Sequence, residues 1–301
     1  MRDPEYDRFG PWVIEISELD PLPPLFLPFL TREEKPLLSV KIPRQIERRN
    51  AHPGMNLYDY LVTLYEEDLI ILQRDGEEVR QERFFYHDIQ FLRYSENLLK
   101  GNLCLGTAVM SYDLPFNTTS KELMRRVVDL IRERYSGGAG VVMKGEAPDI
   151  AQGELSFYFS RLLAREKKQF PERRLLATQS DTAIGFSETG VLRRVLFGAA
   201  SKTLLESLHF CDGRELKVIT RSKAYKYRWQ TEYGASTYII PLLNISGVSW
   251  EEDAQNTAVT TLTVQTAGEP VSFAFIRHNP WLESYDRFLA AVLQPVGEAA
   301  S

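Results

Sequence analysis

Residues 58–94 read YDYLVTLYEEDLIILQRDGEEVRQERFFYHDIQFLRY, and this stretch decides the fold class. Between 58 and 64, large apolar residues alternate with other residues at period two, which is typical of a strand with one buried face. The apolar run 69–72 leads to Asp75-Gly76, and Asp-Gly is the strongest short-range signal for a β-hairpin. The short spacing between turns therefore predicts an antiparallel meander.

The residues that follow change from a strand pattern to a helix pattern. Runs 103–105 and 108–116 continue the meander, and Thr119 then begins a capping-box pattern. The apolar residues after it are spaced for one stripe of an amphipathic helix that lies on a sheet. The predicted cap and stripe of this helix are Thr119, Leu123, Val127 and Ile131.

The second half of the chain repeats this order. Asp212-Gly213 marks another hairpin, further β runs follow, and Asn279-Pro280 predicts the start of a closing helix. The predicted cap and stripe of that helix are Asn279, Trp281, Tyr285, Phe288, Leu289 and Val292. The sequence thus predicts a mainly β, α+β fold of two curved antiparallel sheets, each capped by a C-terminal helix.

Three local matches between the halves indicate an internal duplication. A duplication predicts two modules of the same fold, so it matters more for the fold prediction than any single motif. The matching pairs are Asp88-Ile89 with Asn244-Ile245, Leu103-x-Leu105 with Leu262-x-Val264, and Leu114-Pro115-Phe116 with Val271-Ser272-Phe273.

The order of these motifs resembles a bacterial pleckstrin-homology-like domain. The resemblance rests on Leu69-Ile-Ile-Leu, Asp75-Gly76, Tyr86-His-Asp-Ile, Leu103-Cys-Leu, Leu114-Pro-Phe-Asn and the closing helix. It covers roughly 57–136 and, less closely, 204–294. In that family a strongly curved seven-stranded antiparallel sheet is plugged at one end by a C-terminal helix. The resemblance therefore implies two half-barrels, and it carries no catalytic signature.

The composition shifts along the chain predict the domain organisation. We expect a Pro-rich N-terminal arm at 1–36, a first module at 37–136, a linker plus helix at 137–174, a second module at 175–296 and a tail at 297–301. The arm either covers a sheet edge or core of its own chain, or serves as a docking peptide for a partner. Exposed apolar patches are rare on soluble monomers, so the first interpretation is favoured.

The totals restrict the class of protein. The chain has 301 residues, 44% of them hydrophobic, and a formal net charge of −5, which argues against nucleic acid as a partner. Its two cysteines, Cys104 and Cys211, suit a reducing compartment. The N-terminus is too acidic for a signal peptide, and no apolar run is long enough for a transmembrane segment. We therefore expect a cytoplasmic protein.

The sequence offers no recognisable catalytic constellation. None of His52, His87, His209 and His278 has a second ligand at metal spacing, so we predict no metal site and no cofactor. His209 and Cys211 are read as structural. The acidic runs, such as 66–68 and 251–253, lie at expected turns and are read as solvated loops. An enzyme is the third hypothesis, because nothing in the pattern pairs functional groups.

One basic segment stands out in this acidic chain. Residues 221–229 read RSKAYKYRW, and as one strand they would place three aromatic residues on one face and basic residues on the other. The resemblance permits an anion or lipid-headgroup site here, because basic side chains hold phosphate oxygens through charge-assisted hydrogen bonds. The candidate residues are Arg221, Lys223, Lys226 and Arg228. The alternative is a half-buried strand with a solvated basic face.

Two functions follow as expectations. The first is a non-catalytic binding or scaffold protein whose modules present sheet edges to an unknown protein partner or to copies of itself. The alternative is peripheral binding to a membrane or phosphate headgroup through the basic segment.

Overall fold

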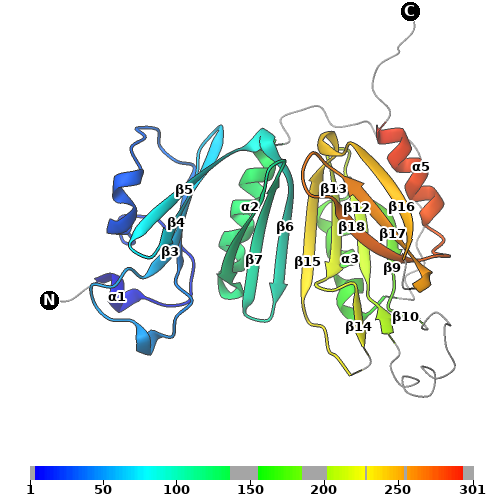
Figure 1. Ribbon diagram of the computed structural model, residues 1–301, viewed down its shortest axis with the longest axis horizontal. Helices are drawn as coiled ribbons and strands as arrows, with labels where there is room; N and C mark the ends of the chain where they lie inside the picture. Colours follow the sequence, from blue (N-terminus) through cyan, green and yellow to red (C-terminus); the bar gives the residue numbers. More distant parts are fainter. Residues whose placement is uncertain (1–3, 136–154, 185–201, 228, 254–255, 294–301) are drawn as a thin grey trace, which may run out of the picture. The chain divides into compact units, whose positions relative to one another are not determined.

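The computed structural model in Figure 1 describes residues 4–135, 155–184, 202–227, 229–253 and 256–293. The chain is mainly β, and every strand pair with a recorded register is antiparallel. The predicted class, a mainly β, α+β protein of antiparallel sheets, is confirmed at this level.

The chain divides into two compact units. Unit 1 comprises 1–89, 98–104 and 113–137, and unit 2 comprises 90–97, 105–112 and 138–301. The predicted first module, 37–136, therefore contributes two segments to the unit that holds the second half of the chain.

Unit 1 contains a five-stranded sheet with the strand order β1-β2-β3-β4-β5. The strands are β1 (Ile14–Glu15), β2 (Leu38–Pro43), β3 (Tyr58–Leu64), β4 (Asp68–Asp75) and β5 (Glu78–Phe85). The hairpin predicted at Asp75-Gly76 is confirmed, since it connects β4 and β5. Gly76 has a φ of 66°, a conformation that glycine adopts without strain.

The N-terminal arm packs on unit 1. It contains α1 (Pro4–Arg8) and a 3-10 helix, η1 (Pro24–Phe29), and β1 extends the sheet beside β2. Phe26 is fully buried in a cluster with Phe9, Leu61 and Leu72. The arm thus covers the core of its own chain, which is the first of the two interpretations above.

The closing helix of the first half is α2 (Lys121–Tyr135), preceded by a 3-10 turn, η4 (Thr118–Ser120). The predicted cap is wrong. Asn117 Oδ1 accepts hydrogen bonds from the Thr119 backbone N–H at 3.0 Å and from the Thr119 hydroxyl at 2.9 Å. Asn117 caps this turn because its side chain reaches the amide two residues ahead.

The buried face of α2 is shifted slightly from the predicted stripe. Val127 and Ile131 are buried as predicted, whereas Leu123 is half-buried at the margin. Met124 and Val128 complete the buried face. The Ser120 hydroxyl accepts a hydrogen bond from the Val13 amide at 2.8 Å, which ties the N-terminal arm to the start of this helix.

A seven-stranded sheet has the strand order β8-β7-β6-β15-β13-β12-β9. Its strands are β6 (Ile89–Asn97), β7 (Lys100–Thr107), β8 (Ser111–Asn117), β9 (Arg174–Gln179), β12 (Ser207–Cys211), β13 (Glu215–Arg221) and β15 (Ala235–Pro241). Within unit 2, β6 and β15 pair from Leu92↔Ile239 to Glu96↔Ala235. The hydroxyl oxygens of Ser95 and Ser236 lie 2.9 Å apart across this ladder. The sequence does not predict the pairing.

Unit 2 contains two further three-stranded sheets. One comprises β16 (Gly247–Asp253), β17 (Asn256–Gln265) and β18 (Val271–Ile276), and the other β10 (Thr182–Ile184), β11 (Lys202–Leu204) and β14 (Tyr225–Tyr227). The hairpin predicted at Asp212-Gly213 is confirmed between β12 and β13, and Gly213 has a φ of 84°.

The closing helix of the second half is α5 (Leu282–Leu293), which contacts β9 (Figure 1). The predicted cap is confirmed, because Asn279 Oδ1 accepts a hydrogen bond from the Trp281 amide at 3.0 Å. Tyr285 and Leu289 are fully buried, Phe288 and Trp281 are half-buried, and the structure does not describe the side chain of Val292.

The predicted helix in the linker is confirmed as α3 (Phe157–Gln169). The Ser156 hydroxyl accepts a hydrogen bond from the Phe159 amide at its start. Phe159 is fully buried and packs with Leu163, Leu175, Leu208 and other residues, so α3 covers part of the seven-stranded sheet.

We expect Phe159→Ala to lower the free energy of unfolding by about 3–5 kcal/mol, because it removes a fully buried aromatic ring and leaves a cavity. Chemical denaturation followed by circular dichroism measures this. The matched control is Phe157→Ala on the same helix, where the side chain is 77% exposed and the loss should stay within about 0.5 kcal/mol. Equal losses in the two variants would contradict the packing of α3.

Candidate functional site

The basic segment is not one continuous strand, so that prediction is wrong. Arg221 is the last residue of β13 in the seven-stranded sheet, whereas β14 (Tyr225–Tyr227) belongs to a separate sheet. A turn that contains Lys223 separates the two strands. Arg228 lies outside the described residues.

Each described basic residue of this segment faces a carboxylate. Arg221 Nη2 lies 3.1 Å from Glu206 Oε2, Lys226 Nζ lies 3.4 Å from Asp181 Oδ2, and Lys223 Nζ lies 3.9 Å from Glu232 Oε2. The three positive charges are therefore locally compensated. A site for a phosphate group would have to compete with these carboxylates for the same N–H donors.

A small cavity adjoins the segment. Its volume is about 90 Å³, and Arg221, Lys223, Tyr238 and Phe273 are among its lining residues. Ligand pockets for drug-sized molecules have volumes of about 300–1,000 Å³, so this one suits a small ion or a few water molecules.

The lining residue Glu206 has a fully buried side chain that is already well bound. It accepts hydrogen bonds from the Ser156 hydroxyl at 2.8 Å and from Arg221 at 3.1 Å. Its negative charge beside Arg221 disfavours a second anion in the cavity.

The aromatic residues of the segment pack in two ways. Tyr227 stacks on Trp229 with ring centroids 5.2 Å apart and an interplanar angle of 6°, and Trp229 is 69% exposed. The Tyr225 hydroxyl donates a hydrogen bond to Asp253 Oδ2 at 3.0 Å. Tyr227 is half-buried, so Trp229 is the member of this pair whose ring can contact an apolar or aromatic surface of a partner.

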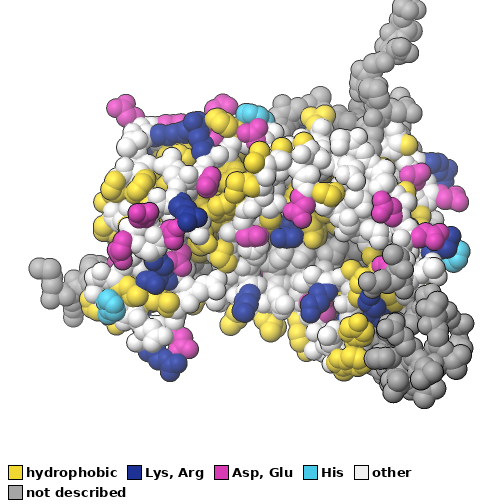
Figure 2. All heavy atoms as spheres, in the orientation of Figure 1, with side chains coloured by type: hydrophobic (Ala, Val, Ile, Leu, Met, Phe, Trp, Pro, Cys, Tyr) yellow, Lys and Arg dark blue, Asp and Glu magenta, His cyan; other side chains and the backbone are white. Residues whose placement is uncertain are grey.

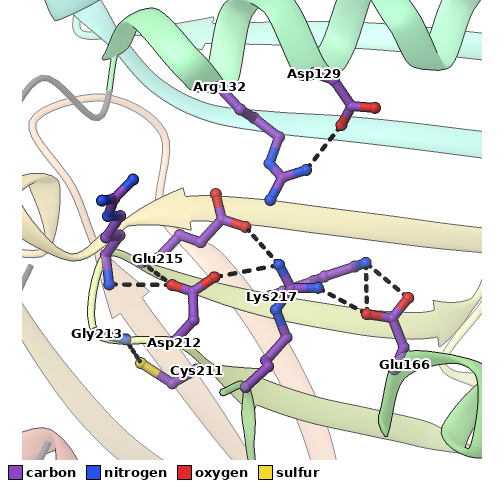
Figure 3. Close-up of polar contacts among 10 residues, drawn as sticks. Asp129, Arg132, Glu166, Cys211, Asp212, Gly213, Glu215 and Lys217 are labelled. Atoms are coloured by element: carbon purple, nitrogen blue, oxygen red, sulfur yellow. Dashed lines mark hydrogen bonds and ion pairs between the residues drawn. The ribbon is translucent and has the colours of Figure 1, made fainter. Parts of the chain in front are cut away.

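A buried charge cluster lies at the β12–β13 hairpin (Figure 3). Arg173 Nη1 lies 2.7 Å from Glu166 Oε2, and Arg173 Nη2 lies 3.2 Å from Asp212 Oδ2 and 3.4 Å from Glu215 Oε1. Lys217 Nζ lies 2.9 Å from both Glu166 carboxylate oxygens. These contacts join α3, the hairpin and the chain just before β9.

The electrostatics of this cluster fit a structural role. Burial raises the pKa of Glu166, but Lys217 and Arg173 outweigh that effect and hold the pKa below its usual value. Burial also raises the pKa of the neighbouring Cys211 thiol to about 12, so this thiol is not a nucleophile at neutral pH. A carboxylate that is ionised and bound by two cations is a poor general base.

Unit 1 has a similar buried carboxylate. Asp68, the first residue of β4, is fully buried and forms a double hydrogen bond with Arg32 at 2.8 and 2.9 Å and a contact with Arg83. Glu215 is likewise the first residue of β13. The interpretation of 66–68 as a solvated loop is therefore wrong for Asp68. An acidic residue directly before an apolar strand was the available signal.

His209 lies in an aromatic cage in unit 2. Its Nδ1 is 3.1 Å from the Tyr285 hydroxyl and its Nε2 is 3.0 Å from the Ser207 hydroxyl. The rings of Phe273 and Phe275 pack on it with centroids 5.2 and 4.8 Å away. Burial lowers the pKa of His209 to about 3, which keeps the ring neutral. This histidine links α5 to the sheet and has no access for a substrate.

The longer end strands of the sheets offer another kind of site. These strands are β5, β8, β9, β16 and β18. An end strand leaves the backbone N–H and C=O groups of its outer side without a ladder partner in its own sheet. In β8, Pro115 removes one amide, and β5 carries several charged side chains that disfavour unspecific pairing.

On the face drawn in Figure 2, Lys and Arg side chains of the described residues lie among Asp and Glu side chains. Among the described residues no group of three or more His, Cys, Asp or Glu side chains could hold a metal ion. No helix in the described ranges is both long and apolar enough to cross a bilayer. No protein-family model matches the chain, and no curated protein is significantly similar to it.

We expect the free energy of unfolding to decrease as the pH falls from 6.5 to 4.5. His209 has a folded-state pKa near 3 and an ordinary value of 6.5, so the unfolded chain binds the additional proton in this range. One such group gives a slope of about 1.4 kcal/mol per pH unit. Urea denaturation at several pH values measures it.

The His209→Gln variant should be less stable at pH 7 and should lose most of that slope. His87→Gln is the control, because the His87 side chain is 78% exposed. A slope that persists in the His209→Gln variant would assign the pH dependence to other groups.

Proposed function

We propose that the chain is a non-catalytic binding or scaffold protein, built from two pleckstrin-homology-like modules that contact other proteins or copies of the chain through strand edges. The element order supports the modules. In the first half, β2 to β5, the 3-10 turn η3 (Tyr86–Asp88), β6 to β8 and α2 follow one another. In the second half, β9, β12, β13 and β15 are followed by a similar turn, η6 (Leu242–Asn244), then by β16 to β18 and α5.

The observation that carries the proposal is the ladder between β6 and β15. These strands belong to different halves of the chain, yet they form five residue pairs and so join strands of both halves in one seven-stranded sheet. Backbone pairing at a sheet edge is a general recognition mode, because the ladder supplies affinity and the side chains supply specificity. The chain already uses this mode internally.

We expect photo-crosslinkable residues on the end strands to capture protein in living cells. Suitable positions are Gln81 on β5, Tyr112 on β8 and Ser249 on β16. The control is the exposed Glu133 on α2, which is not on a strand. Specific adducts from one or more strand positions, identified by mass spectrometry, support edge recognition. The absence of adducts at all three positions, with the protein folded and expressed, would overturn it.

The second candidate function is the binding of an anionic lipid headgroup. The cavity beside Arg221 and Lys223 favours it, whereas the carboxylates that face Arg221, Lys223 and Lys226 oppose it. Exposed ion pairs contribute little energy, but the side chain of Glu206 is fully buried, and a phosphate would have to displace it from Arg221.

We expect equal sedimentation with anionic liposomes for the wild type and for a variant with Arg221, Lys223, Lys226 and Arg228 changed to Ser. The expectation follows from the local compensation of charge in this segment. The comparison is made at low salt, where surface electrostatics is strongest. A clear loss of pelleting in the variant would favour headgroup binding instead.

A further inference from the structure

The two halves have equivalent turns between their sheets, and these turns fix a residue correspondence. In η3 the amide of Ile89 donates to the Tyr86 carbonyl, and in η6 the amide of Ile245 donates to the Leu242 carbonyl. The strand before the turn ends at Phe85 in β5 and at Pro241 in β15. Positions in β5 and β6 therefore correspond to those in β15 and β16.

One strand on each side of these turns takes part in the internal ladder. The first half contributes β6, the strand after its turn, and the second half contributes β15, the strand before its turn. Their counterparts are β16 and β5, which are both end strands of their sheets. The strand before the first turn, β5, and the strand after the second turn, β16, thus take no part in the internal ladder.

We propose that β16 of one chain pairs antiparallel with β5 of a second copy and so repeats the β6–β15 ladder between molecules. This inference rests on the proposed function, and it names the partner and the strands. Each copy then offers two different edges, so the contact is heterologous and copies associate head to tail.

The register of the internal ladder transfers to the proposed one through the turn correspondence. Ser95, which lies opposite Ser236, corresponds to Glu251, and Ser236 corresponds to Arg80. The transferred pair is thus a glutamate directly opposite an arginine. Opposite charges in such a cross-strand position stabilise a sheet by about 0.2–1 kcal/mol.

The faces of the two strands agree as well. Trp250 packs on Phe275 and Tyr285 in unit 2, and Val79 packs on the core cluster of unit 1. In the transferred register Trp250 lies opposite Gln81 and Glu252 lies opposite Val79, so the two core-facing residues share one side. Glu251 and Arg80 share the other side, and both are exposed.

The existing ion pair of Arg80 does not prevent Arg80 from pairing with Glu251 of a second copy. Arg80 Nη2 lies 2.5 Å from Asp75 Oδ2, but the two side chains are 71% and 52% exposed, so their pairing contributes little. One step beyond the transferred five pairs, Glu78 would lie opposite Asp253. Because these two negative charges repel each other, we expect the proposed ladder to have five residue pairs, as the β6–β15 ladder has.

Light scattering coupled to size-exclusion chromatography tests the proposal with the full chain. The wild type should associate as its concentration rises. Arg80→Glu or Glu251→Arg should each weaken association about tenfold, because like charges then face each other across the ladder. An equimolar mixture of the two variants should restore association, because each edge again meets the opposite charge on a neighbouring chain.

Failure of the mixture to associate would overturn the proposal, as would a wild type that stays monomeric at all concentrations. Association of each single variant at the wild-type level would overturn it equally. The mixing experiment also excludes pairing of β16 with β5 of the same chain, because that contact could not be restored by a second molecule.

A cross-linking experiment checks the register independently of affinity. Oxidation of a mixture of the Arg80→Cys and Glu251→Cys variants should give a disulfide-linked dimer, since directly opposite residues have Cβ atoms about 4.5–5.5 Å apart. Native Cys104 and Cys211 are buried. Gln81→Cys is the matched control for Arg80→Cys, because adjacent strand residues point to opposite faces.

An equal yield with the Gln81→Cys control would contradict the register. Loss of both results, together with adducts to other proteins in the photo-crosslinking experiment, would reject self-pairing and leave edge recognition intact. Loss of all three results would reject the proposed function itself.

Discussion

The backbone ladder between β6 and β15 is the interaction on which the arrangement of the sheets depends. Without this ladder, β6 and β15 would each expose a row of backbone donors and acceptors. The ladder satisfies these groups and needs no particular side chains. The Ser95–Ser236 contact adds one polar cross-strand pair. Because of this ladder, strands from both halves form one seven-stranded sheet, and a division of the chain by sequence does not coincide with its compact units.

Buried carboxylates mark the start of one strand in the five-stranded sheet and of one strand in the seven-stranded sheet. Asp68 and Glu215 each begin a strand and each receive an arginine, Arg32 and Arg173 respectively. Removing one partner of such a pair costs more than the pair contributes, because an unpaired charge remains in the interior. The arginines therefore specify where the strands begin. His209 is also buried, and two hydroxyl groups satisfy its ring nitrogens: Ser207 on the same strand and Tyr285, which ties α5 to the sheet.

Local signals predicted most elements of the fold. Both Asp-Gly hairpins, the amphipathic helices and the Asn279 cap depend on neighbouring residues, so the sequence shows them directly. Competition between close alternatives was harder to judge. The capping residue is Asn117 and not the predicted Thr119, because Asn117 is the last residue of β8 and its side chain reaches the Thr119 amide. The basic segment was divided by a turn that its alternating pattern concealed.

Contacts between distant residues were not predicted. The carboxylates that face Arg221, Lys223 and Lys226 include Asp181 and Glu206, which belong to other strands or loops. Similarly, the apolar pattern of β6 is that of an ordinary sheet strand and does not reveal which strand lies beside it. Such partners depend on the tertiary fold, and a single sequence carries no local mark of them.

The separation along the chain of β6 and β15 has a consequence for biosynthesis. Ser95 leaves the ribosome 141 residues before Ser236, which is roughly 10–30 s at ordinary rates of translation. During this interval β6 has no β15 to pair with, so the corresponding edge of the nascent first half stays open to unspecific pairing. A ribosome that stalls between the two strands would hold a chain whose seven-stranded sheet is incomplete.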